Sequence, residues 1–223
     1  MTRASVLALG LVTAVSVQAV ANDGRTEWQF TALLDGDVVG THDFVVEPAG
    51  PPSTERRTLT SRARFTVKVL GIALYRYRHE VRERWHDGCL ESIAARTDDN
   101  GTVTEVDGRL RGDRFDVVVR DPADASQRSS ADSGRGCVWS FAYWNPALAR
   151  QQRLLDPGTG RMTPVEIQSL PDRSIEVAGR RVQARGIRII GSANPIDVWY
   201  HDERWVGLDT TVGGGRTLSY RMR

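Results

Sequence analysis

The sequence lacks the short motifs that mark the common catalytic sites. It has no GxSxG nucleophile motif, no HExxH zinc motif, no P-loop and no paired CxxC. His79, Glu80 and Glu83 partly resemble a zinc-protease pattern, but on a predicted strand His79 and Glu83 lie about 13 Å apart, too far to share a metal unaided. We therefore predict no catalytic residue, no metal site and no cofactor. Enzymatic activity is left open and is less expected than a binding or structural role.

Cysteine is nearly missing, since the chain has only Cys89 and Cys137. In an exported chain such a pair predicts a disulfide, because the compartment is oxidising. Cys89 begins a predicted strand and Cys137 follows a predicted loop, so the bond would anchor that loop to the sheet. Two buried thiols are the alternative.

Long apolar runs are missing too, except at the N-terminus. Residues 1–21 combine one early positive charge, Arg3, with an apolar run and the small-x-small sequence AVA, which together predict a cleaved secretory signal peptide. No later run is long enough to cross a bilayer as a helix. We therefore expect an exported protein, periplasmic or secreted, with a single β domain at 22–223.

The chain also lacks a strong charge of either sign. Removal of residues 1–21, with Arg3, leaves 29 basic against 28 acidic residues and a net charge of +1. Nucleic-acid-binding domains normally carry a clear basic excess, so we predict no nucleic acid partner. Any basic surface must be local.

Two long strands organise what is present. From Arg57 to Val69, and again from Ala73 to Trp85, residues alternate with the period of two that is typical of half-buried strands. The turn between them lies around Gly71. A three-residue connection predicts three cross-strand pairs: Val67 with Tyr75, Phe65 with Tyr77 and Ala63 with His79.

A tighter turn at Asp87-Gly88 predicts a third antiparallel strand. This register gives the three-stranded sheet two faces of different chemistry, an inner mixed face and an outer basic face. The expected pairs are Trp85 with Leu90, Arg84 with Glu91, Val81 with Ala94 and His79 with Arg96.

The inner face carries ionisable groups among aromatic ones, which is unusual for a solid core because an unpaired buried charge is costly. Two interpretations stay open. The polar groups form a satisfied structural network, or they line a water-accessible cavity for a ligand with an apolar body and a polar end. The predicted ligand-binding residues, with the apolar hairpin tip as a lip, are Leu70, Ile72, Tyr75, Tyr77, His79, Glu83, Trp85 and Arg96.

The outer face is rich in arginine. Such a face predicts contact with an anionic membrane surface or an anionic envelope polymer. The alternative is a solvated face whose arginines pair with acids of neighbouring strands. The residues expected to meet an anionic partner are Arg62, Arg64, Lys68, Arg76 and Arg78.

The remaining segments predict further short strands, as in a sandwich or barrel. Residues 121–136 have the composition of a flexible loop, and 138–144 are apolar on both faces, which predicts an interior strand. Asn145 and Pro146 predict the start of one short helix over 147–155. The predicted fold class is therefore all-β: a strongly curved antiparallel sheet or open barrel with one short helix.

The opening hairpin places His42 on one face with Gly40 and Phe44. We interpret His42 as a packed or edge histidine rather than a ligand-binding one. The last third of the chain predicts strands at 162–170, 174–178, 181–190, 196–200, 204–212 and 217–222.

Several stretches together resemble an uncharacterised family of exported bacterial proteins. They are DGxxxGxHxF in the first hairpin, VKVLGIALYRYRHEVRERWHDGCLESIAARTDDNG in the long strands, YWNP before LLDPGTG, and DVWYHDERWVGLD near the end. The family is a domain of unknown function, so the resemblance implies architecture and compartment only. At the level of the fold, the wrapped sheet is also similar to the half-barrels of periplasmic lipoprotein carriers.

The expected function is binding of an amphipathic or lipid-like small molecule outside the cytoplasm. The alternative is a non-enzymatic structural or interaction protein of the cell envelope that docks through the Arg-rich face. A pocket of several hundred Å³ favours the first and a filled interior favours the second. The sequence predicts no oligomeric state.

Overall fold

The computed structural model describes residues 24–51, 55–69 and 72–223, so the predicted signal peptide and Leu70 lie outside the described residues. The first eight strands are β1 (Thr26–Leu34), β2 (Asp37–Pro48), β3 (Arg56–Val69), β4 (Ile72–His86), β5 (Cys89–Asp99), β6 (Thr102–Arg111), β7 (Arg114–Asp121) and β8 (Asp124–Arg135). They are followed by the 3₁₀ helix η1 (Pro146–Arg150), β9 (Arg153–Leu155), β10 (Met162–Pro164), β11 (Glu166–Val177), β12 (Arg180–Ile190), β13 (Ile196–His201), β14 (Arg204–Val212), the 3₁₀ turn η2 (Gly213–Gly215) and β15 (Arg216–Met222).

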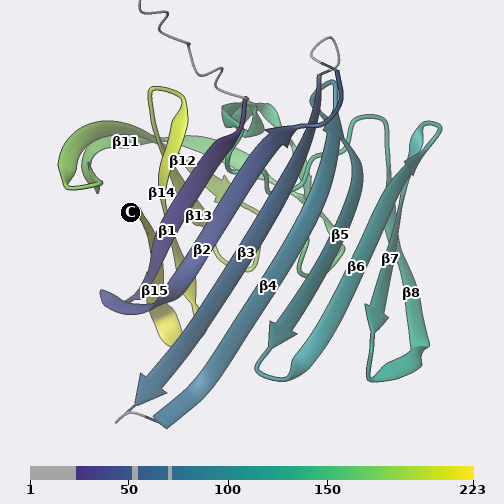
Figure 1. Ribbon diagram of the computed structural model, residues 1–223, viewed down its shortest axis with the longest axis horizontal. Coiled ribbons are helices and arrows are strands. Elements are labelled where there is room, and N and C mark those ends of the chain that lie inside the picture. Colours follow the sequence, from purple (N-terminus) through teal and green to yellow (C-terminus); the bar gives the residue numbers. More distant parts are fainter. Residues whose placement is uncertain (1–23, 52–54, 70–71) are drawn as a thin grey trace, which may run out of the picture.

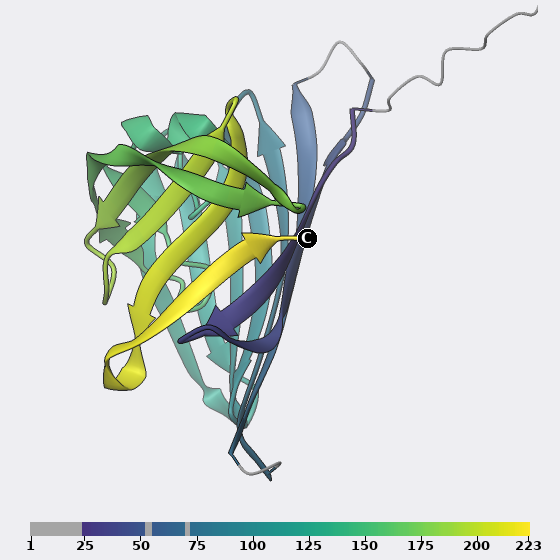
Figure 2. The same ribbon diagram turned by 90° about the vertical axis from the view of Figure 1, so that its left-hand side faces the viewer.

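Thirteen strands form one antiparallel sheet in the order β11-β12-β13-β14-β15-β1-β2-β3-β4-β5-β6-β7-β8, and β9 pairs with β10 apart from it. The sheet is open, with β8 and β11 at its edges. It consists of two meanders that the first and last strands join, since Ala32 of β1 faces Tyr220 of β15. Figures 1 and 2 show how strongly the sheet curves. The predicted all-β class with a curved sheet is confirmed.

The three pairs predicted for the two long strands are confirmed, but the predicted three-residue connection is wrong: Val69 faces Ile72, and Leu74 is an extra residue in β4 that restores the register. The pairs Val67 with Tyr75, Phe65 with Tyr77 and Ala63 with His79 all occur across β3 and β4. Along β4 from His79 to Trp85, the odd-numbered residues are buried and the even-numbered ones are exposed. The period of two therefore separates a concave, buried face from a convex, charged face.

A bulge in β5 makes the predicted register of β4 and β5 wrong beyond its first pair. Trp85 faces Leu90 as expected, and Glu91 is then an extra residue in β5. The pairs predicted as Arg84 with Glu91, Val81 with Ala94 and His79 with Arg96 are instead Arg84 with Ser92, Val81 with Ala95 and His79 with Thr97.

Burial explains this shift. A slip of one residue moves every later side chain to the opposite face, and the bulge brings Ile93 and Ala95 into the core, where both are buried. It also turns Thr97 inward and Arg96 outward. Arg96 is exposed and forms an ion pair with Glu105 of β6, so its predicted place on the inner face is wrong.

Residues 121–136, predicted as a flexible loop, instead contain the edge strand β8. Its backbone pairs with β7, with Ser130 opposite Val118 and Ser129 opposite Val119. The polar composition that predicts a loop is also compatible with an edge strand, because only one side of such a strand pairs with the sheet.

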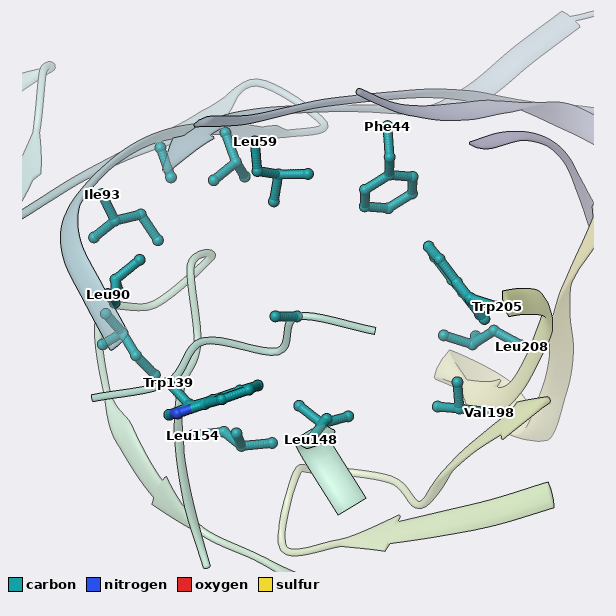
Figure 3. Close-up of a cluster of buried hydrophobic side chains, with 14 of the residues drawn as sticks. Phe44, Leu59, Leu90, Ile93, Trp139, Leu148, Leu154, Val198, Trp205 and Leu208 are labelled. Carbon is teal, nitrogen blue, oxygen red and sulfur yellow. The ribbon is translucent and has the colours of Figure 1, made fainter. Parts of the chain in front are cut away.

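Residues 138–144, predicted as an interior strand, are interior but irregular. Their path is held by one parallel bridge between Ser140 and Leu155. Figure 3 shows Trp139, Leu148 and Leu154 lying together inside the curve of the sheet. The segment therefore covers the concave face from within.

The helix predicted over 147–155 is limited to η1. The Asn145 side chain caps it as predicted, by accepting a hydrogen bond of 3.0 Å from the Ala147 N–H. The helix stops early because Leu154 and Leu155 are fully buried and pair with β10. Within the described part of the chain, no helix has both the length and the apolar character needed to cross a membrane.

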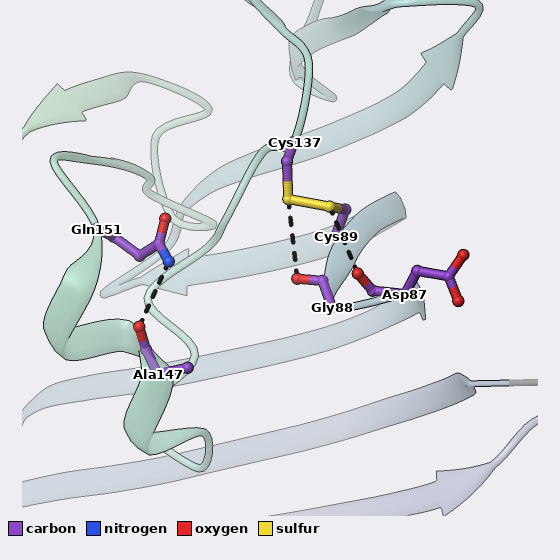
Figure 4. Close-up of a disulfide and its surroundings, with 6 residues drawn as sticks. All are labelled: Asp87, Gly88, Cys89, Cys137, Ala147 and Gln151. Atoms are coloured by element: carbon purple, nitrogen blue, oxygen red, sulfur yellow. Dashed lines mark hydrogen bonds between the residues drawn. A yellow bond between two sulfur atoms is a disulfide. The ribbon is translucent and has the colours of Figure 1, made fainter.

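A disulfide ties the interior segment, residues 136–165, to the sheet. Cys89, the first residue of β5, is bonded to Cys137, as predicted (Figure 4). Next to it, the Leu90 N–H donates to the Val138 carbonyl oxygen at 2.9 Å. The bond therefore fixes the point at which the segment enters the interior.

The double variant Cys89→Ser/Cys137→Ser is expected to be less stable than the wild type. The disulfide spans a sequence separation of 48, and in the chain-entropy model a loop of that size contributes about 4 kcal/mol. For a domain of this length, the melting temperature should fall by about 8–16 °C. Calorimetry of both proteins without reductant measures the difference, and equal melting temperatures would contradict the expectation.

Candidate ligand-binding cavity

The concave face of the sheet lines a partly open cavity of about 250 Å³. Strands β2, β3 and β4 form one wall, β13, β14 and β15 form the other, and the interior segment lies between them. Its apolar lining includes Phe44, Leu59, Val81, Phe141, Leu208 and Leu218. Its polar lining includes His42, Ser61, Tyr77, His79, Glu83, Tyr143, Asp156 and Tyr220.

Small side chains in the inner row of β3 leave this space open. Ser61 lies between Phe44 of β2 and Val81 of β4, and Ala63 lies between His42 and His79. A row of large side chains at these positions would fill the gap, because protein interiors pack densely. Figure 3 shows the apolar wall from within, with Phe44, Leu59 and Leu208 around the space.

His42 is buried and links two hydroxyl groups. Its Nδ1 lies 3.1 Å from Tyr220 Oη and its Nε2 lies 2.7 Å from Ser61 Oγ. Each hydroxyl is able to donate or accept, so either neutral tautomer of the ring is satisfied. Burial lowers the pKa of His42 well below its ordinary value, and repulsion from His79 adds to the effect. The ring is therefore uncharged at neutral pH.

Ser61 and His42 lie close enough to act as a nucleophile and its general base, but the charges around them do not favour that chemistry. In serine hydrolases a buried carboxylate stabilises the charged imidazole. The third group here is Tyr220, a phenol whose pKa burial raises. With its own pKa lowered, His42 is a weak proton acceptor. The arrangement suits hydrogen bonding better than proton transfer.

His79 and Glu83 extend the polar lining along β4. Burial lowers the pKa of His79 to about 4, against a smaller opposing effect of Asp156, and its Nδ1 lies 2.9 Å from Thr97 Oγ1. Glu83 accepts a hydrogen bond of 2.8 Å from Trp85 Nε1. Burial raises the pKa of Glu83 to about 7. At neutral pH His79 is therefore uncharged, and Glu83 is near the midpoint of its titration.

The charge balance of the lining disfavours an anion. Among the described residues that line the cavity there is no lysine or arginine, whereas Glu83 and Asp156 are acids. Burial raises the pKa of Tyr77 and Tyr143, so both phenols keep their protons as hydrogen-bond donors. An anionic group placed here would lose its water without gaining a counter-charge. The lining therefore disfavours an anionic group and offers neutral hydrogen-bonding partners.

Part of the predicted ligand-binding set comes together in this cavity. Tyr77, His79 and Glu83 line it. Trp85 is buried beside Glu83 and lines instead a second cavity of about 520 Å³ at the far end of β4, whose lining includes several charged side chains. We take the first cavity as the candidate site, because it gathers polar groups that are themselves buried.

The other predicted residues lie elsewhere. Tyr75 and Ile72 lie nearer the end of the β3–β4 hairpin and are not part of the lining, and Ile72 is mostly exposed. Arg96 lies on the convex face. Leu70 is outside the described residues.

Five of the eight polar lining residues named above are absent from the set predicted from the sequence: His42, Ser61, Tyr143, Asp156 and Tyr220. For His42, the local pattern predicts a packed or edge histidine, although His42 shares an inner row with Phe44. Ser61 is one of the small inward-facing residues of β3, and the pattern gives it no role. Tyr143, Asp156 and Tyr220 come from distant segments, and no local pattern indicates which wall they reach.

On the convex face, arginines alternate with acids across the strands. Arg62 lies between Asp43 and Glu80, and this order continues through Arg96 to Glu105. Opposite charges on adjacent strands stabilise a sheet. The alternative interpretation of the Arg-rich face, pairing with neighbouring acids, therefore describes the middle of the sheet. Lys68, Arg76 and Arg78 lie beyond this row, toward the hairpin end.

Together the fold and the cavity define a class: an open, barrel-like β protein with a hollow interior. One solved structure of this kind is the beta-barrel-like protein of domain of unknown function DUF1849 from Brucella abortus, with a TM-score of 0.56 and 12% sequence identity over 89% of this chain and 94% of that chain. At that identity the likeness shows the fold alone. The chain itself belongs to the family described as domain of unknown function DUF6134, whose model matches residues 30–223. The predicted membership of an uncharacterised, barrel-like family is confirmed. No curated protein matches the sequence.

Glu83→Gln is expected to stabilise the protein at alkaline pH. The pKa of Glu83 in the folded state, about 7, lies above its ordinary value of 4.5, so the wild type loses stability as the pH rises through this window and the buried carboxyl ionises. Glutamine keeps an acceptor for Trp85 and carries no charge. Relative to the wild type, the unfolding free energy of the variant should gain about 3 kcal/mol across the window.

Chemical denaturation at a series of pH values measures this gain. Glu80→Gln is the matched control, because Glu80 lies on the same strand but faces solvent, and it should produce a much smaller pH dependence. A difference between Glu83→Gln and the wild type that stays constant with pH would contradict a neutral, buried Glu83.

Proposed function

We propose that the protein is an exported binding protein that holds a small amphipathic molecule in the cavity of its concave face. The observation that carries the proposal is a set of buried polar groups that border open space. His42, Ser61, His79 and Glu83 are each buried, and all four line the cavity. A purely structural network would close around these groups, because a void forfeits packing contacts.

The volume supports a ligand of modest size. An engineered apolar cavity of about 150 Å³ binds benzene. A cavity of about 250 Å³ suits a larger body, such as two fused rings or part of an acyl chain. Phe44, Leu59, Leu208 and Leu218 supply the apolar wall for it.

The ligand's polar end is expected to be uncharged. Neutral imidazoles, phenols and a hydroxyl donate and accept hydrogen bonds without supplying a positive charge. The acids Glu83 and Asp156 repel a carboxylate or a phosphate. Alcohols and glycerol esters of lipid-like molecules therefore fit the lining better than free fatty acids.

The disulfide supports a place of action outside the cytoplasm. The bond between Cys89 and Cys137 is typical of proteins in oxidising compartments. The periplasm or the cell exterior agrees with the signal peptide predicted at 1–21.

Two probes with the same body test the proposal. 2-Naphthol and 2-naphthoate share two fused rings and differ in the charge of the polar end. Isothermal titration calorimetry at about pH 8 should show binding of 2-naphthol, and binding of 2-naphthoate at least about tenfold weaker, because its carboxylate would be buried without a counter-charge.

Two matched tryptophan variants locate the binding. Leu218→Trp places bulk in the cavity wall and should abolish the binding of 2-naphthol. Leu170→Trp changes another partly buried leucine, which packs in a separate cluster with Trp199, and should leave binding unchanged. Binding that survives Leu218→Trp, equal binding of the two probes, or no binding of either would contradict the proposal.

A further inference from the structure

Exposed hydrophobic side chains gather at one end of the sheet. Among the residues whose side chains the structure describes, three large hydrophobic ones are mostly exposed: Val38 at 70%, Ile72 at 67% and Leu74 at 60%. Ile72 and Leu74 lie at the end of the β3–β4 hairpin, and Val38 borders one groove with Lys68 of β3. Figures 1 and 2 show that this end of β3 and β4 projects beyond the neighbouring strands.

Exposed cations lie directly beside these apolar side chains. Leu74, Arg76 and Arg78 of β4 are all exposed, and Leu74 is the extra residue of a bulge two positions before Arg76. Lys68 of β3 is exposed as well and faces Ala73 across the hairpin.

Acids are fewer at this end than in the middle of the convex face, although the exposed Asp37 borders the groove of Val38 and Lys68. Arg76 faces the uncharged Thr66, and Arg78 faces another arginine, Arg64. On the other side of β4, Arg78 faces one acid, Asp98 of β5. Arg64 lies 3.9 Å from Glu80. This end is therefore more basic than the alternating row around Arg62.

We propose that this end of the sheet docks on an anionic lipid bilayer. The docking tip consists of Val38, Lys68, Ile72, Leu74, Arg76 and Arg78. Its apolar side chains enter the interface between headgroups and acyl chains, while its cations contact lipid phosphates. The proposal rests on the surface alone, so it holds or fails independently of any ligand in the cavity.

The combination of the two side-chain types favours a bilayer over a soluble anionic polymer. A polymer would use the cations but would leave Ile72 and Leu74 in water. A bilayer provides anionic phosphates and an apolar layer within a few Å of each other. Leu74 and Arg76 lie two residues apart on β4, so an apolar and a cationic side chain are separated by a similar distance. Exposed apolar groups beside cations are the pattern of proteins that lie on a membrane surface.

Vesicle flotation with the purified, disulfide-bonded protein tests the proposal. The wild type should bind vesicles of phosphatidylglycerol and phosphatidylcholine, and bind vesicles of phosphatidylcholine alone much more weakly. Lys68→Gln/Arg76→Gln/Arg78→Gln should weaken binding to the anionic vesicles by about a hundredfold, since each cation near such a surface contributes about fivefold.

The matched control is Arg56→Gln/Arg82→Gln/Arg84→Gln, which removes the same charge from the same face of the same two strands at their other end. It should change binding by less than about fivefold, because charges beyond a Debye length from the surface are screened. Ile72→Ser/Leu74→Ser should remove the binding that persists at high salt. Circular dichroism and melting temperatures check that each exposed variant stays folded.

Several outcomes would overturn the proposal. Equal losses in the two triple variants would mean that general charge attraction suffices. Binding to a soluble anionic polysaccharide without binding to vesicles would assign the cations to a polymer. A dimer in sedimentation that Ile72→Ser/Leu74→Ser abolishes, without any vesicle binding, would assign the apolar tip to a second copy of the chain.

Discussion

The structure depends on covering the concave face of a single curved sheet. In the described part of the chain, backbone pairing joins the two meanders at β1 and β15, and no sheet larger than the two-stranded pair β9–β10 packs over their apolar side. The chain instead leads residues 136–165 back across the hollow, anchored by the disulfide of Cys89 and by the hydrogen bond to Leu90. Leu148 and Leu154 of this segment have no exposed surface. Because the covering segment is short and irregular, it does not fill the hollow, and the space that remains is the cavity.

Strand alternation lets a highly charged sequence keep its arginines out of the concave interior. In the run from Arg76 to His79, arginines point to solvent while the tyrosine and the histidine point inward. Outside, the charges are compensated across strands or left in water. Inside, burial shifts each titration so that the neutral form of His79 predominates at neutral pH. Hydrogen bonds between neutral groups, such as His42 with Ser61 and His79 with Thr97, cost less desolvation than buried ion pairs would.

Features that depend on local pattern are predictable from this sequence, and features that depend on distant contacts are not. Alternation, a local property, predicts which residues of β3 and β4 face each other, but it does not indicate the shorter connection or the compensating bulge at Leu74. The polar strand β8 looks like a loop because an edge strand needs no apolar face. Leu154 and Leu155 continue a helical pattern, yet their burial against the sheet selects an extended strand. Tyr220 reaches the cavity through the pairing of β1 with β15, and Asp156 reaches it through the interior segment. No motif near either residue in the sequence indicates these contacts.

The bulge at Glu91 determines which charged side chains face the cavity. Without this extra residue, the regular register would set Arg96 opposite His79 on the concave face. A guanidinium there would lie beside acids and attract an anionic ligand. The bulge instead places Arg96 between Glu80 and Glu105 on the convex face and sets the Thr97 hydroxyl against the imidazole of His79. One inserted residue thus completes the alternating row of charges outside, and it leaves the cavity lining without a guanidinium.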